Sequence, residues 1–268
     1  MKQLLRGAAR VVLPPAAAFL AFLALWHVYS AGVRVGDTVL LRPQPAYMVP
    51  GPAAVAQAGI ENLDTLIRAS LLTAGGALAG FLASLALGSL VAFLFSQSVL
   101  IQRAAYPYAI FLQTVPIVAI APLIILWFGH GFAGIAVTAF IVSLFPIITN
   151  GTAGLTSLDR SAVELFEVNN ATRLQFLFKL RLPSSIPHFV TGAKIGSGLA
   201  VIGGIVGEFF AGFGSGKFGL GYLIFQTSAQ LKTAALFAAI FASTVLGLIA
   251  FGGVSLVGDR LLARWRRD

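Results

Sequence analysis

The sequence contains no cysteine and few charged residues. The absence of cysteine excludes a disulfide framework, a cysteine-based metal site and a thiol nucleophile. Charged residues make up 10% of the chain, against about 25% in a typical soluble domain. Because 58% of the 268 residues are hydrophobic, a soluble fold of this size would leave much apolar surface in water. The composition therefore indicates a membrane protein.

The excess of basic over acidic residues gives a formal net charge of +9. Such a charge is also typical of nucleic-acid-binding proteins, so its distribution matters. Most lysines and arginines lie at the two ends of the chain and in one central loop, between apolar runs. We interpret them as signals of membrane topology and as contacts with anionic lipid, and we expect no nucleic-acid partner.

Apolar runs long enough to cross a membrane as helices, roughly 20 residues each, predict an all-α protein with six transmembrane spans. The first run is longer than the apolar part of a signal peptide, so we expect a retained helix. The third contains Pro107, Pro116 and Pro122, which predict a kinked or broken helix. The six predicted spans are 11–31, 66–96, 104–128, 132–150, 187–212 and 234–257.

The positive-inside rule sets the expected orientation. With a cytoplasmic N-terminus, 13 of the 18 basic residues lie inside and 5 lie outside. An even number of spans then places both termini in the cytoplasm. We expect a cytoplasmic N-terminal tail at 1–10, one transmembrane domain at 11–259, and a basic, lipid-facing cytoplasmic tail at 260–268.

Two external segments interrupt the spans. Residues 34–65 begin as a proline-rich stretch and continue as a predicted interfacial helix from Ala53. Residues 213–233 contain many glycines around Lys217, which predict an external hairpin or a re-entrant segment.

The longest cytoplasmic loop, residues 151–186, mixes charged and apolar residues. Its apolar residues recur at helical spacing, and Asn169-Asn170 marks a break because asparagine tolerates the left-handed conformation. Asn170 or Thr172 is a suitable cap for a second helix, after which Leu182-Pro183 leads back into the membrane. An amphipathic helix outside the bilayer can dock its apolar face on a cytoplasmic partner. An ordinary connecting loop that packs on its own helix ends is the alternative.

This loop resembles the "EAA" coupling loop of the permeases of bacterial ATP-binding-cassette (ABC) importers. In that pattern Glu-Ala-Ala is followed by glycine and then, about a dozen residues later, by Leu-Pro. Here Glu164-Leu165-Phe166 takes the place of Glu-Ala-Ala, and Asn170 takes the place of the glycine. The resemblance implies that the loop contacts the ATPase through Glu164, Leu165, Phe166, Glu167, Asn170, Ala171, Thr172, Leu182 and Pro183.

The resemblance extends over about residues 60–262. Residues 104–150 are similar to the core of these permeases, and 186–224, with GSGLAVIGGIVGEFF and GLGYLI, to the last third of the fold. It is strongest to the subgroup that imports nitrate, sulfonates, taurine and pyrimidine or flavin precursors. It implies the type I importer permease fold in the bacterial cytoplasmic (inner) membrane.

The same resemblance implies the partners. These are two ABC ATPase subunits that bind ATP and magnesium, an extracytoplasmic solute-binding protein, and a second permease copy in a homodimer. The chain itself lacks a GxxxxGK[ST] phosphate loop, so ATP hydrolysis is expected on the partner, and neither a cofactor nor an enzymatic activity is expected here.

Three polar residues within the predicted spans are candidates for the solute pathway. Gln113 and Thr114 precede Pro116, where polar groups either reach into a pore or satisfy the freed backbone. Glu208 is an ionisable group inside a span, a costly placement. It either lines the outer half of the pathway, holds two helices together, or lies at the outer interface.

Other features favour packing over chemistry. Gly192, Gly196, Ala200, Gly204 and Gly207 form a small-residue face that allows close approach of another helix, internal or in a second subunit. Lys194 is expected to extend toward the inner surface. The sequence shows no metal-ligand spacing. The main alternative function is an ATP-independent secondary transporter or channel, and the substrate stays open.

Overall fold

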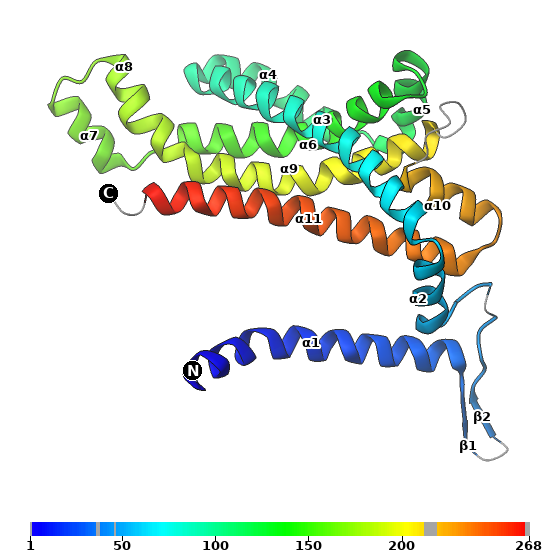
Figure 1. The fold of residues 1–268 in the computed structure, drawn as a ribbon. Coiled ribbons are helices and arrows are strands. Elements are labelled where there is room, and N and C mark those ends of the chain that lie inside the picture. The colour runs from blue at the N-terminus through cyan, green and yellow to red at the C-terminus, as the bar shows by residue number, and fades with distance from the viewer. Residues whose placement is uncertain (1, 36–37, 46, 212–218, 266–268) are drawn as a thin grey trace. The chain divides into compact units, whose positions relative to one another are not determined.

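The computed structural model describes residues 2–35, 38–45, 47–211 and 219–265 (Figure 1). They fold almost wholly into helices and form two compact units, one of residues 1–66 with 224–240 and one of 67–223 with 241–268. In the described part of the chain, five helices are long and apolar enough to cross a membrane, and a sixth apolar helix is shorter. The predicted all-α membrane class is confirmed. Lys217 and the end of the basic tail fall in 212–218 and 266–268, outside the described residues.

The first unit begins with helix α1 (Lys2–Ala31), whose candidate span Leu13–Ala31 confirms the first prediction. Strands β1 (Val33–Val35) and β2 (Thr38–Leu41) follow as an antiparallel pair. Strands were not among the predictions for this stretch, although Val33, Val35, Thr38 and Val39 are β-branched residues that favour strands. The predicted helix from Ala53 is α2 (Pro52–Glu61), with proline at its first position, where no N–H is needed.

The second unit contains most of four long helices. They are α3 (Leu63–Gln97), α6 (Phe132–Thr156), α9 (Leu182–Ala211) and α11 (Thr233–Trp265). All four confirm predicted spans, but several ends were placed too early or too late. α6 continues six residues past Asn150, and α9 begins at 182 instead of 187. In these extensions, polar side chains donate to their own helix: Thr156 to the carbonyl of Thr152 and Ser185 to that of Leu182, both at 2.8 Å.

The third predicted span is two helices, α4 (Val99–Thr114) and α5 (Ile117–Phe128). The break occurs at Val115 and Pro116, both extended, so the predicted interruption is confirmed at one of the three prolines. Pro107 and Pro122 lie inside α4 and α5. Helix α5 is one of the shorter apolar helices, below the length expected of a complete span.

Helices α6 and α9 run side by side (Figure 1), joined through the small-residue face of α9. A Cβ added at Gly207 would lie 3.1 Å from Cα of Ile135, and one at Gly192 would lie 2.9 Å from the carbonyl oxygen of Pro146. The face is therefore an internal contact, one of the two predicted alternatives. Helix α3 packs on α6 in the same way, because a Cβ at Gly80 would overlap the carbonyl oxygen of Ala136. The core at these contacts contains Ala77, Phe81, Ala139, Ile147, Ala193, Ala200 and Val201.

Candidate functional site

The candidate coupling loop forms two short helices at one end of α6 and α9 (Figure 1). Helix α7 (Arg160–Val168) is capped by Asp159, whose carboxylate accepts the amide N–H of Ser161 at 3.3 Å. Helix α8 (Arg173–Phe176) continues directly into a wider π-helical turn, η1 (Leu177–Arg181), and then into α9. The predicted order of helix, sharp turn and second helix is confirmed.

The turn between α7 and α8 is closed by backbone and side-chain hydrogen bonds. Asn170 has φ +48°, so its backbone is left-handed. The amides of Ala171 and Asn170 donate to the carbonyls of Phe166 and Glu167, both at 3.0 Å, the pattern of a Schellman helix end. Thr172 then caps α8 in a reciprocal capping box with Gln175. These local bonds fix the angle between the two helices.

Helix α7 has an outward and an inward face. Leu165 and Val168 are 61% and 80% exposed, whereas Phe166 packs edge-on against Phe176 of α8, with ring centroids 6.0 Å apart. Leu174 and Phe178 on the following helical segment are also exposed. Glu164, predicted to take the glutamate position of a coupling loop, forms an exposed ion pair with Arg160 at 3.0 Å. The loop therefore presents an apolar outer surface, hereafter the docking face (Leu165, Val168, Leu174 and Phe178).

Leu182 and Pro183 lie in the first turn of α9 and do not separate a loop from a span. The helix is continuous here because η1 accommodates the proline: Leu182 donates its amide to the carbonyl of Leu177, five residues back. Proline lacks the N–H that a regular α-helical turn would require. The placement of the span start at 187 was therefore wrong by about one and a half turns.

Gln113 and Thr114 lie at the end of α4, beside the break, and both are exposed. The hydroxyl of Thr114 donates to the carbonyl of Phe111 at 2.8 Å. This bond is the local backbone satisfaction that was one of the two predicted alternatives for Thr114. The pathway role of both residues stays a prediction.

Glu208 is 3% exposed and holds three segments together. Its carboxylate accepts the hydroxyl of Thr73 in α3 at 2.8 Å and the amide of Gly221 at 2.9 Å. Gly221 belongs to helix α10 (Leu220–Ala229), whose first amide, at Leu220, donates to the hydroxyl oxygen of Thr73 at 2.9 Å. Glu208 and Thr73 together satisfy the first amides of α10, which have no partner within the helix.

The glycines of the GLGYLI segment make this bonding possible. A Cβ at Gly219 would overlap the carboxylate of Glu208, and one at Gly221 would overlap the carbonyl oxygen of Ile205. Sequence reasoning singled out Glu208 but missed Thr73 and Gly219. Thr73 lies 135 residues away along the chain, and no local pattern connects them.

Lys194, which was expected to extend toward the inner surface, forms an ion pair with an exposed aspartate. Its Nζ lies 2.9 Å from Oδ1 of Asp259 in α11, and the lysine side chain is 22% exposed against 65% for the aspartate. The pair links α9 to α11. It adds a charged contact between helices that composition did not reveal.

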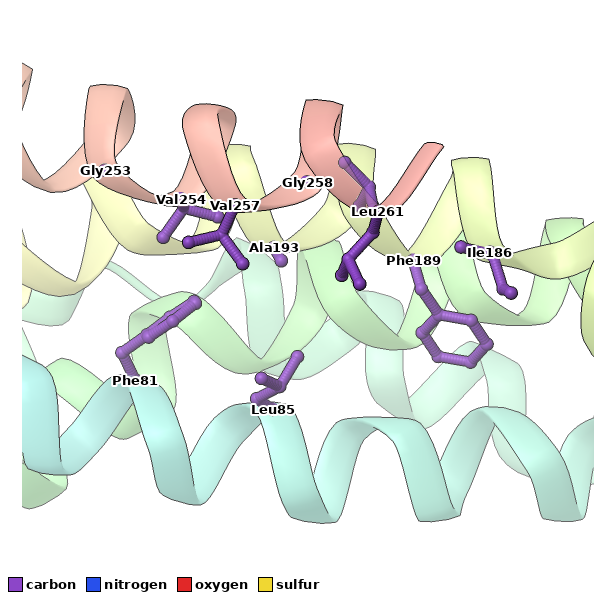
Figure 2. Close-up of a pocket in the computed structure, with 11 residues that line it drawn as sticks. Phe81, Leu85, Ile186, Phe189, Ala193, Gly253, Val254, Val257, Gly258 and Leu261 are labelled. Carbon is purple, nitrogen blue, oxygen red and sulfur yellow. The ribbon is translucent and has the colours of Figure 1, made fainter. Parts of the chain in front are cut away.

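A cavity of about 490 Å³ opens between α3, α9 and α11 (Figure 2). Its walls are apolar side chains and glycines, among them Phe81, Leu85, Phe189, Ala193, Val254 and Val257. A polar solute would lose its hydration here without gaining hydrogen bonds. The cavity is therefore not suited to a polar solute. In the described part of the chain, no group of three or more His, Cys, Asp or Glu residues is placed to hold a metal ion.

The chain is similar in sequence to known membrane transport components. Residues 84–263 match the sequence profile of the family described as "Binding-protein-dependent transport system inner membrane component". The formylaminopyrimidine transport permease protein ThiX of Halalkalibacterium halodurans is 31% identical, over 95% of this chain and 96% of the relative. The riboflavin transport system permease protein RibX of Chloroflexus aurantiacus is 32% identical, over 85% and 84%. The nitrate import permease protein NrtB of Leptolyngbya laminosa is 26% identical, over 93% and 88%.

Proposed function

Because the chain belongs to the family of binding-protein-dependent transport system inner membrane components, we propose that its loop 151–186 docks on a separate ATPase that drives import. The chain is the inner-membrane permease of an ABC importer of small solutes and is not an enzyme. ATP and magnesium bind to the partner, an ABC ATPase dimer. An extracytoplasmic binding protein delivers the solute, and a second copy of the permease completes the pathway.

The docking face carries this proposal. Its four large apolar side chains are between 61% and 80% exposed. Leu165 and Val168 lie on α7, outside the candidate spans, and Leu174 and Phe178 lie at the start of the candidate span Arg173–Ala211. Exposed apolar side chains on a short helix are typical of a helix that inserts into a groove of a partner. The capped turn at Asn170 and the contact between Phe166 and Phe176 hold α7 and α8 together as one rigid unit. A displacement of α7 by the ATPase would therefore displace α8 as well.

Orientation follows from this docking. An ATPase that uses cytoplasmic ATP places loop 151–186 inside, together with both termini. The tail at 1–10 is then cytoplasmic, residues 11–259 form the transmembrane domain, and the basic segment 260–268 contacts anionic lipid.

The solute is a small polar compound, and a pyrimidine-type or flavin-type vitamin precursor is favoured. The support is the identity of 31–32% to the formylaminopyrimidine and riboflavin permeases, against 29% to an aliphatic sulfonate permease and 26% to the nitrate permease. Gln113 and Thr114, exposed at the break between α4 and α5, are proposed to face the pathway. Glu208 is proposed to act as an anchor for α10, since both donors that it accepts are buried backbone or hydroxyl groups of this chain.

Co-purification with the ATPase subunit tests the docking proposal. Leu165→Asp or Val168→Asp places a charge on the docking face, and we expect the affinity for the ATPase to fall at least about tenfold, as for a central apolar contact of an interface. Lys179→Gln, a change at an exposed position of the same loop, is the control and should bind normally. Normal binding by both aspartate variants would refute the docking face, and transport by the permease alone would favour the ATP-independent alternative.

A further inference from the structure

Arg181, the last residue of η1, makes a contact that the predicted coupling loop did not include. Its Nη1 donates to the backbone carbonyl of Ser96 at 3.2 Å, 85 residues earlier in the chain. Ser96 is the second-last residue of α3, so its carbonyl is one of the four that have no partner within the helix. The positive charge of the guanidinium is also attracted to the negative C-terminal end of the α3 helix dipole.

The same guanidinium is joined to α7 through two aromatic rings. Cζ of Arg181 lies 5.4 Å from the centroid of the Phe176 ring, a cation–π distance. Phe176 in turn packs edge-on against Phe166 on the inner face of α7. A continuous series of side-chain contacts therefore leads from α7 through Phe166, Phe176 and Arg181 to the carbonyl of Ser96.

This carbonyl lies at the junction of α3 and α4. Helix α3 ends at Gln97, and the side chain of Ser98 caps α4 by accepting the amide of Ile101. The junction is further held by the edge-on contact of Phe95 in α3 with Tyr106 in α4, at 6.4 Å. A displacement of the Ser96 carbonyl thus reaches α4, which ends at the break beside Gln113 and Thr114.

Arg181 is not fully satisfied where it lies. Its Nε is buried and has no hydrogen-bond partner among the described residues. A buried donor without a partner costs free energy, and π-helical turns such as η1 are frequent at functional sites. Both features fit a residue that changes hydrogen-bond partners during a movement.

We propose that Arg181 is a positioning residue that transmits the movement of the docked loop to the junction of α3 and α4. The proposal rests on the proposed function, because it takes α7 as the element that the ATPase moves. It adds a specific path to that function: the rings of Phe166 and Phe176, the Arg181 guanidinium and the end of α3.

The absence of cysteine permits a direct test in the complete complex with the ATPase. Leu100, near the start of α4 and 78% exposed, is replaced by cysteine, which becomes the single thiol of the permease. Its maleimide labelling rate is measured by mass spectrometry, without nucleotide and with a non-hydrolysable ATP analogue plus magnesium. The second change is Arg181→Met, which keeps an apolar stem of similar length and removes all donors.

In the single-cysteine permease that retains Arg181, we expect nucleotide to change the labelling rate at least about fivefold. This factor is the lower end of typical coupling between two sites. In Arg181→Met this change is lost, while the ATPase still co-purifies and still hydrolyses ATP. Lys179→Gln, two residues earlier and exposed, retains the change. Arg181→Lys, which can still donate to the Ser96 carbonyl, retains part of it and serves if the methionine variant does not fold.

Three results would overturn the inference. The labelling rate in Arg181→Met could still respond to nucleotide, or the rate could fail to respond even with Arg181 present. The ATPase could also be lost from both Arg181 variants, which would make Arg181 a docking residue. The proposed function fails separately, when the unmodified permease binds no ATPase at all.

Discussion

Replacing Glu208 separates its two candidate roles, a charge in the solute pathway and an anchor for α10. In Glu208→Ala, the amide of Gly221 loses its acceptor in a buried place, while the hydroxyl of Thr73 can still donate to the carbonyl of Ala69 at 3.0 Å. One buried donor without a partner costs about 1–3 kcal/mol. In Glu208→Gln, the amide oxygen can accept the same two donors, so we expect a loss below about 1 kcal/mol.

Hydrogen exchange of the peptide 219–223 in lipid nanodiscs measures this difference. A local cost of about 1–3 kcal/mol corresponds to amide exchange about 5–150 times faster. We expect this increase in Glu208→Ala. We also expect it in Gly219→Ala, because a Cβ at this position would overlap the carboxylate of Glu208. Glu208→Gln should exchange nearly as the unmodified protein does and should still transport. The matched control is Gly198→Ala on the same helix, where an added Cβ meets no atom within 4 Å. Transport abolished in Glu208→Gln, with exchange unchanged, would refute the anchor and favour the pathway.

Three further predictions concern packing and the loop. Gly80→Ala places a Cβ against backbone atoms of α6 and should destabilise the protein by about 1–3 kcal/mol in thermal unfolding. The control Gly198→Ala should not destabilise it, and equal melting temperatures of the two variants would contradict the close contact of α3 and α6. Asn170→Gly should leave ATPase binding intact, because both residues accept φ +48°. Asn170→Val should destabilise the turn by about 1–2 kcal/mol and weaken ATPase binding in a pull-down. A valine variant that binds normally would argue against a fixed turn. Lys194→Met and Asp259→Asn should be non-additive in a double-mutant cycle by about 0.2–1 kcal/mol, since the two side chains form one ion pair; strict additivity would show that the pair contributes nothing.

The spans were predictable because long apolar runs have few alternative structures in a chain with so few charges. Errors arose at the ends, where polar residues were taken for loops. Asn150 and Thr156 are instead satisfied within α6, by donating to the carbonyls of Pro146 and Thr152. A hydroxyl or amide that bonds to its own helix four residues back hides its polarity from lipid, and the composition alone does not distinguish this case from a loop.

The local geometry of the loop was also predictable, since the asparagine pair and Thr172 are residues that favour helix ends. The long-range bonds were not. Thr73 with Glu208, and Ser96 with Arg181, join residues 135 and 85 positions apart. Which buried carboxylate meets which hydroxyl depends on how α3 and α9 pack, and a single sequence does not contain this information.

We expect import to require a separate ATPase that acts through loop 151–186. The most direct test is uptake into proteoliposomes that contain the permease, the ATPase and the binding protein, with formylaminopyrimidine, riboflavin, nitrate and a sulfonate as candidate solutes. One of these solutes should be taken up only when ATP and the ATPase are present, and uptake should be lost in Leu165→Asp. Uptake of the same solute by the permease alone, without ATP, would contradict this expectation.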